Sequence, residues 1–194
     1  MNVLSDLTGV VLAGGQSRRL GTDKAFIEVE GVPMIGRVLG ALWACCADVV
    51  IVAKDPARYQ GLDARLIPDA WPAQAPLVGV CSGLRAMETP WGFVAACDLP
   101  FLSPDAVRLL ARLAVGSDAA VPRVDGRWHP LHAVYRAAVA PLLEARMEQG
   151  TRSMIDALKA LRVRPVTEEE LRAVDATLRT LHNVNAPQDL PTIA

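Results

Sequence analysis

Short apolar runs of strand length alternate with segments of helical period through the first two thirds of the chain, and this alternation constrains the fold more than any other feature. The runs rich in β-branched residues span residues 9–13, 49–53, 65–68, 93–96, 119–124 and 131–135. The helical segments span residues 33–46, 77–87 and 104–114. Strands that alternate with crossover helices predict a mostly parallel, doubly wound α/β sheet flanked by helices.

Local signals refine this prediction. Ser103 fits the N-cap of a helix with Pro104 at its first position, and Thr167 with Glu170 forms a T-x-x-E capping box. Two strand-like runs surround Asp125–Gly126 within residues 121–135, so we expect a hairpin that makes the sheet mixed. A length of 194 residues without a linker or repeat predicts one domain over residues 1–194.

Composition and charge exclude several classes of function. Twenty Lys and Arg against 21 Asp and Glu give a formal net charge of −1, which argues against a nucleic-acid partner. No apolar run approaches the ~18–20 residues of a membrane span, and the first residues lack the pattern of a signal peptide. We therefore expect a cytoplasmic protein without a membrane role. Its cysteines lack zinc-site spacing, so we expect reduced core thiols at Cys45, Cys46, Cys81 and Cys97.

A loop that combines glycines with cations follows the first predicted strand. It reads GGQSRRLGTDK and contains Arg18, Arg19 and Lys24. Glycines let backbone N–H groups approach an anion, while the cations offset the charge of a triphosphate. Neither the Walker A pattern nor the dinucleotide fingerprint fits these residues. The loop therefore indicates a phosphate-binding site, although a glycine-rich turn with solvated basic residues is the alternative.

Two aspartates follow predicted strands. Asp98 ends a buried-type strand and precedes Leu99-Pro100, which stops the ladder, so its carboxylate is expected at the ligand-binding edge of the sheet. A carboxylate there can hold a divalent cation against phosphate oxygens. Asp69 follows residues 65–68 and can reach the same edge, although a turn-forming role between prolines is its alternative. We expect Asp98 to be the metal ligand.

Several motifs stand in one order along the chain and together resemble the molybdenum cofactor guanylyltransferase family. The resemblance spans nearly the whole sequence, and its opening pattern L-A-G-G…R-x-G-x-D-K with C-D-x-P is specific to this family and its nucleotidyltransferase relatives. The matching segments are LAGG at 12–15, RRLG at 18–21, DK at 23–24, PLVG at 76–79, CDLP at 97–100 and NVNAP at 183–187.

The resemblance implies a Rossmann-like nucleotidyltransferase fold that uses GTP and Mg²⁺. Its expected reaction converts molybdopterin-bound molybdenum cofactor into the guanine dinucleotide form and releases pyrophosphate, and maturation proteins of molybdoenzymes are expected as further partners. Asp98 is expected to bind both the metal and the GTP phosphates, and Arg19 to face the triphosphate as a third catalytic residue beside Lys24 and Asp98. The residues expected to bind the nucleotide are Leu12, Ala13, Gly14, Gly15, Lys24, Asp69 and Asp98.

Two positions bear on the choice of nucleotide. Members of the family often carry Asn at the end of the second strand, whereas this chain reads VVIVAK there and Lys54 is the residue that can take its place. Related cytidylyltransferases typically open L-A-A-G, whereas this chain has Gly14 followed by Gly15. The resemblance therefore implies a guanine rather than a cytosine base. Our steric hypothesis for this preference is that a second glycine lets the larger purine lie against the backbone.

Four residues are expected to contact the acceptor. Asn183 and Asn185 project from one face of an extended segment, although an Asx-turn before Pro187 is their alternative. His129 stands in an H-P pair that resembles the family, and Arg152 follows Gly150-Thr151 where it can anchor an anion. His132 is expected to be packed or at the surface, because a strand directs residues three apart to opposite faces and no metal pair with His129 results.

The expected chemistry needs alignment and charge neutralisation rather than proton transfer. A terminal phosphate monoester has a second pKa of ~6 and is largely dianionic at neutral pH, so it attacks without a general base. This agrees with a sequence that carries no Ser-His-Asp or Cys-His signature. The alternatives are a nucleotidyltransferase that uses CTP or a sugar phosphate, and a GTP-binding assembly factor without catalysis.

Overall fold

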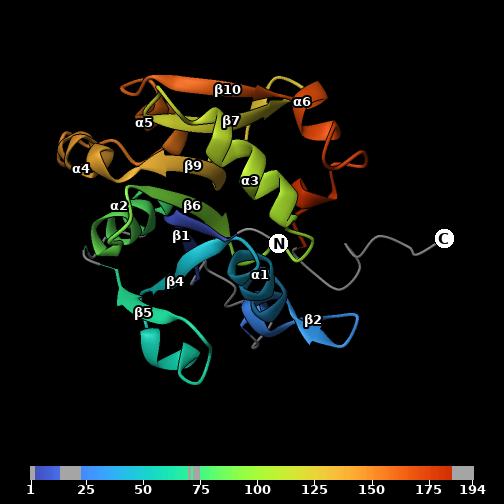
Figure 1. Ribbon diagram of the computed structural model, residues 1–194. Coiled ribbons are helices and arrows are strands. Elements are labelled where there is room, and N and C mark those ends of the chain that lie inside the picture. Colours follow the sequence, from blue (N-terminus) through green and yellow to red (C-terminus); the bar gives the residue numbers. More distant parts are fainter. Residues whose placement is uncertain (1–2, 14–22, 70, 72–74, 185–194) are drawn as a thin grey trace.

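A mixed sheet of eight strands organises the part of the chain that the computed structural model describes, residues 3–13, 23–69, 71 and 75–184 (Figure 1). The strand order across the sheet is β10-β7-β9-β6-β1-β4-β5, and β8 pairs with β7. Figure 1 shows this order from β10 at the top to β5 at the bottom. The strands are β1 (Leu4–Leu12), β4 (Cys46–Ala53), β5 (Arg65–Pro68), β6 (Trp91–Ala96), β7 (Ala119–Val124), β8 (Arg127–Trp128), β9 (His132–Arg136) and β10 (Val163–Thr167).

Strand directions confirm the predicted mostly parallel, mixed arrangement. β5, β4, β1 and β6 run parallel to one another, whereas β9 is antiparallel to both β6 and β7. At the far edge β10 is parallel to β7. The carboxyl ends of the four central parallel strands therefore meet at one edge of the sheet, where ligands bind in open α/β folds.

Helices cover both faces of the sheet and bury alternate strand residues. α1 and α3 pack on one face with Val11, Ile51 and Phe93, while α2, α4 and α5 pack on the other with Val10 and Val94. This alternation is the period of two that a strand imposes on its side chains. The α-helices are α1 (Met34–Trp43), α2 (Pro76–Ala86), α3 (Pro104–Leu113), α4 (Ala140–Glu148), α5 (Met154–Leu158) and α6 (Glu168–Arg172).

Smaller elements complete the described chain. They are the hairpin of β2 (Glu28–Val29) with β3 (Val32–Pro33) and the 3₁₀ turns η2 (Lys24–Phe26), η3 (Pro56–Tyr59), η4 (Ala137–Val139) and η5 (Arg179–Leu181). Among the described helices, none has the length and apolar character that a membrane span requires.

The predicted local signals are confirmed. The Ser103 hydroxyl accepts a hydrogen bond from the Ala106 backbone N–H at the start of α3, and both halves of the capping box between Thr167 and Glu170 form in α6. Asp125 and Gly126 have φ angles of 48° and 76°, the positive values that the central residues of a tight hairpin turn adopt. β7 and β8 pair antiparallel around them, as the expected hairpin requires.

Several boundaries and elements differ from the prediction. The helix expected to reach residue 46 ends at Trp43, because Cys46 begins β4 and lies opposite Leu4 of a first strand that starts earlier than expected. The strand expected over 131–135 spans His132–Arg136. β10, which contains Pro165, is not among the predicted strands. It lies at the edge of the sheet, a position where proline is tolerated.

Candidate active site

The ends of neighbouring strands are joined by backbone hydrogen bonds at the carboxyl edge of the sheet. The Cys97 N–H donates to the Leu12 carbonyl over 3.1 Å, and the Ala13 N–H donates to the Val52 carbonyl over 2.9 Å. On the next strand the Asp69 N–H donates to Ala53 over 3.0 Å. Three of the expected nucleotide-binding residues, Leu12, Ala13 and Asp69, thus lie on one continuous edge.

An ion pair between Lys24 and Asp98 stands at this edge. Lys24 Nζ lies 2.6 Å from Asp98 Oδ2, and the two side chains are only 15% and 17% exposed. The other carboxylate oxygen, Asp98 Oδ1, is buried and accepts no hydrogen bond from any described residue. A buried carboxylate oxygen without a donor is rare, because burial without a hydrogen bond costs free energy. The geometry therefore leaves one oxygen of Asp98 able to take a ligand.

Asp69 carries a second buried oxygen of this kind. Its Oδ1 is buried without a hydrogen-bond partner among the described residues, and burial raises the pKa of this carboxyl, an effect that Lys54 partly opposes. α2 approaches closely here: a Cβ at Gly79 would lie 3.7 Å from Asp69 Oδ1 and 3.1 Å from a methyl of Leu12. The absence of a side chain at Gly79 therefore preserves space beside both residues.

The carboxylate of Asp98 has the chemistry that a magnesium site needs. The described residues contain no cluster of three His, Cys, Asp or Glu side chains that could enclose a metal. Mg²⁺ is commonly held by one or two carboxylates together with substrate phosphates, so a closed protein cage is not required. The unpartnered oxygen of Asp98 fits such a site, in which nucleotide phosphates would supply further ligands.

Two of the expected acceptor residues, His129 and Asn183, lie at the same edge of the sheet as this ion pair. His129 precedes β9, whose first residue pairs with Ala95 near the end of β6, so it belongs to the same edge. Burial lowers the pKa of half-buried His129, and Arg127 adds to this effect. Exposed Asn183 precedes Val184, whose N–H donates to the Asp98 carbonyl over 2.9 Å. The edge therefore has a neutral imidazole and an amide on its acceptor side.

The side chain of Arg152 binds backbone carbonyls at and beyond the end of α4. Its guanidinium donates to the Met147 carbonyl over 2.7 Å and to the Thr151 carbonyl over 3.0 Å at the end of α4. Contacts of this kind satisfy the last carbonyls of a helix. The acceptor role expected for Arg152 stays a prediction. Four further residues of the predicted site, Gly14, Gly15, Arg19 and Asn185, lie outside the described residues, as does Arg18.

The Cys97 thiol and the His132 ring are two further groups whose surroundings the structure defines. Burial raises the pKa of the Cys97 thiol to about 12, and the nearby Asp98 carboxylate adds to the shift, so the group stays neutral. His132 is buried against the Phe93 ring with centroids 5.1 Å apart, which confirms the packed position expected from the sequence. All four cysteines are free thiols, also as expected.

Known proteins are similar to this chain over most of its length. The MobA-like NTP transferase domain matches residues 9–163. The molybdenum cofactor guanylyltransferase of Desulfosudis oleivorans is 36% identical over 95% of this chain and 92% of its own length. The probable molybdenum cofactor guanylyltransferase of Pelotomaculum thermopropionicum is 37% identical over 94% of this chain and 89% of its own.

The chain belongs to the molybdenum cofactor guanylyltransferase family. A crystal structure of molybdopterin-guanine dinucleotide biosynthesis protein A from Archaeoglobus fulgidus superimposes with a TM-score of 0.81, with 30% identity and 94% of each chain covered. A 2-C-methyl-D-erythritol 4-phosphate cytidylyltransferase from Thermus thermophilus, at 22% identity and a TM-score of 0.66, shares the fold. The expected family and nucleotidyltransferase fold are thus confirmed.

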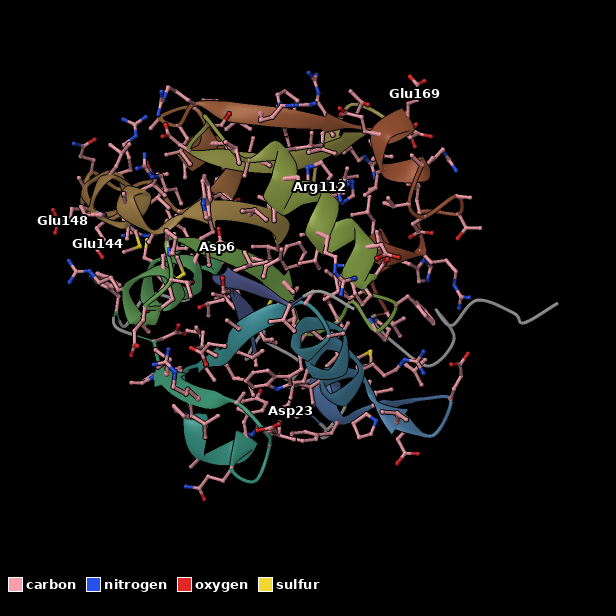
Figure 2. The ribbon with its side chains drawn as sticks, in the orientation of Figure 1. Asp6, Asp23, Arg112, Glu144, Glu148 and Glu169 are labelled. Atoms are coloured by element: carbon pink, nitrogen blue, oxygen red, sulfur yellow. The ribbon has the colours of Figure 1, made fainter. Side chains whose placement is uncertain are left out.

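Sequence reasoning missed the surroundings of Lys24 in this member of the guanylyltransferase family. The D-K motif by itself gives Asp23 no role, yet its Oδ1 accepts a hydrogen bond from the Ala25 N–H and caps η2, which begins at Lys24. Figure 2 labels Asp23 between the blue segment around α1 and the teal segment that follows β4. An aspartate directly before a short helical turn is a capping signal, so this contact was open to prediction.

Proposed function

We propose that this protein transfers GMP from GTP to the terminal phosphate of molybdopterin-bound molybdenum cofactor, forming the guanine dinucleotide cofactor and pyrophosphate. The acceptor phosphate oxygen attacks the α-phosphorus of GTP, and the bond from that phosphorus to the bridging oxygen of the β-phosphate breaks. The electron pair leaves with pyrophosphate. Family membership supports the reaction class, and the Lys24–Asp98 pair is the observation that carries the proposal.

The ion pair supplies the two charges that this reaction needs at one place. The ammonium of Lys24 can stabilise negative charge on phosphate oxygens, and the carboxylate of Asp98 can hold a cation that does the same. Both side chains are largely shielded from water, which strengthens their electrostatic interactions. A solvated surface pair would contribute little of this kind.

We propose that Asp98 holds Mg²⁺ through the oxygen that no described residue contacts. When bound, Mg²⁺ supplies Lewis-acid stabilisation of phosphate charge. Asp69 is proposed to accept a hydrogen bond from the nucleotide at its own buried oxygen, since ribose hydroxyls and the guanine N–H groups are donors. Leu12 and Ala13 line the same edge through the end of β1 and the residue after it.

The acceptor is proposed to enter beside His129 and Asn183. The backbone bond from Val184 to the Asp98 carbonyl fixes the segment of Asn183 next to the ion pair. A neutral imidazole and an amide can hydrogen-bond a polar pterin without adding charge. Asn185 and Arg152 complete the predicted acceptor set. Maturation partners and a cytoplasmic location stay predictions.

Pyrophosphate release tests the proposal directly. Purified protein with Mg²⁺ and molybdopterin-bound cofactor is given GTP, CTP, ATP or UTP in parallel, and pyrophosphate and the dinucleotide product are measured. We expect release with GTP to exceed release with CTP, and chelation of the metal to abolish it. A larger rate with CTP would assign the protein to cytidylyl transfer. GTP binding without any pyrophosphate release would indicate an assembly factor.

A further inference from the structure

Tyr59 contacts the residues around Lys24, Asp23 before it and Phe26 after it, from a different part of the chain. It ends η3, the turn between β4 and β5, and is only 1% exposed. Its hydroxyl donates a hydrogen bond to Asp23 Oδ2 over 2.9 Å. Its ring stacks on Phe26, with centroids 5.8 Å apart and planes inclined by 15°. Tyr59 therefore touches the residue before Lys24 and the last residue of the turn that Lys24 begins.

Asp23 connects these contacts to the backbone of the turn that begins at Lys24. One oxygen accepts from the Ala25 N–H over 3.1 Å, and the other accepts from Tyr59. Arg58 adds an ion pair with that second oxygen at 3.1 Å, but its side chain is 53% exposed whereas that of Asp23 is 11% exposed. The hydrogen bond from Tyr59 is thus the shielded contact, and the ion pair from Arg58 is the solvated one.

The protonation state of Tyr59 suits a donor. Burial raises the pKa of its hydroxyl above the ordinary range, and the hydrogen bond to Asp23 raises it further. The hydroxyl therefore keeps its proton across the physiological range. A hydrogen bond to a charged acceptor contributes more than one between neutral groups.

We propose that Tyr59 is a positioning residue that acts through Asp23 to hold Lys24 in place against Asp98 and the transferred nucleotide. The proposal rests on the proposed guanylyl transfer for its kinetic test. Tyr59 hydrogen-bonds Asp23 and stacks on Phe26, so its action passes through the turn that carries Lys24. A small shift of a charged group at a reacting centre lowers the rate strongly.

Tyr59→Phe tests this proposal with little disturbance of packing. The ring and its stacking on Phe26 remain, and only the hydroxyl is lost. We expect kcat to fall roughly tenfold while the KM for GTP changes less than twofold, since a bond of this kind is worth about one power of ten. The matched control is Thr8→Val, which removes another buried hydroxyl bond, 2.8 Å to Thr89, from the middle of β1. Thr8→Val should lower the melting temperature about as much as Tyr59→Phe does and leave kcat unchanged.

A double-mutant cycle separates positioning from general destabilisation. If Tyr59 acts through Lys24, Tyr59→Phe should not lower kcat further in a Lys24→Ala background. The proposal would be overturned if Tyr59→Phe lowered kcat by the same factor with and without Lys24. It would also be overturned if Tyr59→Phe left kcat unchanged in a protein that is otherwise active. Asp23→Ala should reproduce the loss and its dependence on Lys24. An inactive wild-type protein would instead contradict the proposed function.

A spectroscopic measurement tests the same contact without turnover. The chain has three lysines, Lys24, Lys54 and Lys159, so the ammonium signals of a ¹⁵N-lysine-labelled protein can be assigned by single substitutions. The shielded pair with Asp98 should give Lys24 a slowly exchanging signal. Tyr59→Phe should broaden or shift that signal, whereas Thr8→Val should not. An unchanged Lys24 signal in Tyr59→Phe would refute the positioning role.

Discussion

The ammonium of Lys24 donates a hydrogen bond to Asp98 in the structure. During the proposed reaction it must also stabilise the charge of the leaving pyrophosphate. Charge builds on the leaving oxygens as the bond to the α-phosphorus breaks, so a positioned cation stabilises the transition state more than bound GTP. We expect Lys24→Ala to lower kcat by about 10²–10³, equivalent to ~3–4 kcal/mol, and to weaken GTP binding much less. Separate measurements of kcat and the GTP dissociation constant check this.

Lys159 provides the matched control for this residue. It pairs with Asp156 at the same 2.6 Å, but the two side chains are 70% and 54% exposed. Lys159→Ala should leave kcat and GTP affinity unchanged. If Lys24→Ala kept full kcat and only weakened GTP binding, Lys24 would bind the ground state and the transition state equally well. That result would contradict the mechanism.

At the scale of elements, the close approach of α2 to β1 depends on Gly83. A Cβ built there would overlap a methyl of buried Val10 and come within 3.2 Å of a methyl of Val52. Valine has a stiff χ1 angle, so neither neighbour moves away easily. We expect Gly83→Ala to lower the free energy of unfolding by ~1–3 kcal/mol through overpacking, measured by urea denaturation.

Gly40 in α1 is the control for helix propensity. It is exposed, and a Cβ there would meet no atom within 4 Å. Alanine is the better helix former by ~0.8–1.0 kcal/mol, so Gly40→Ala should stabilise the protein. If both substitutions stabilise equally, the contact between α2 and β1 is looser than the structure shows.

The elements that sequence reasoning recovered are those with a strong local signal. A few consecutive residues suffice to predict the apolar runs of β4 and β6 and the helix cap at Ser103. β10 has no such local signal. It contains Pro165, and a proline fits a strand of this sheet only because β10 lies at its edge. The site divides in the same way. Lys24 and Asp98 stand in motifs, whereas the bond between Tyr59 and Asp23 joins residues 36 positions apart and exists only once β4 and η3 are folded.

At the scale of the whole molecule, His132 connects the sheet to the C-terminal part of the described chain. The fully buried ring packs on Phe93 of β6, and its Nε2 lies 3.5 Å from the Thr180 hydroxyl in η5. Thr180 in turn accepts a hydrogen bond from the Ser103 N–H at the start of α3. Charging this imidazole would therefore place a positive charge at a buried position where three elements meet.

Stability is expected to fall in mild acid because of His132. Burial lowers the pKa of His132 in the folded protein to about 3, whereas the unfolded chain titrates near the ordinary value of 6.5. The unfolded state thus binds this proton first, so the stabilisation present above about pH 6.5 is lost as the pH falls toward 3. Between about pH 7 and pH 5 the free energy of unfolding should fall by about 2 kcal/mol because of this one group.

His132→Leu should remove that part of the fall when urea titrations are compared at the two pH values. His182→Leu, at an exposed position, should not. The same loss in wild-type and His132→Leu proteins would show that other groups cause the acid sensitivity.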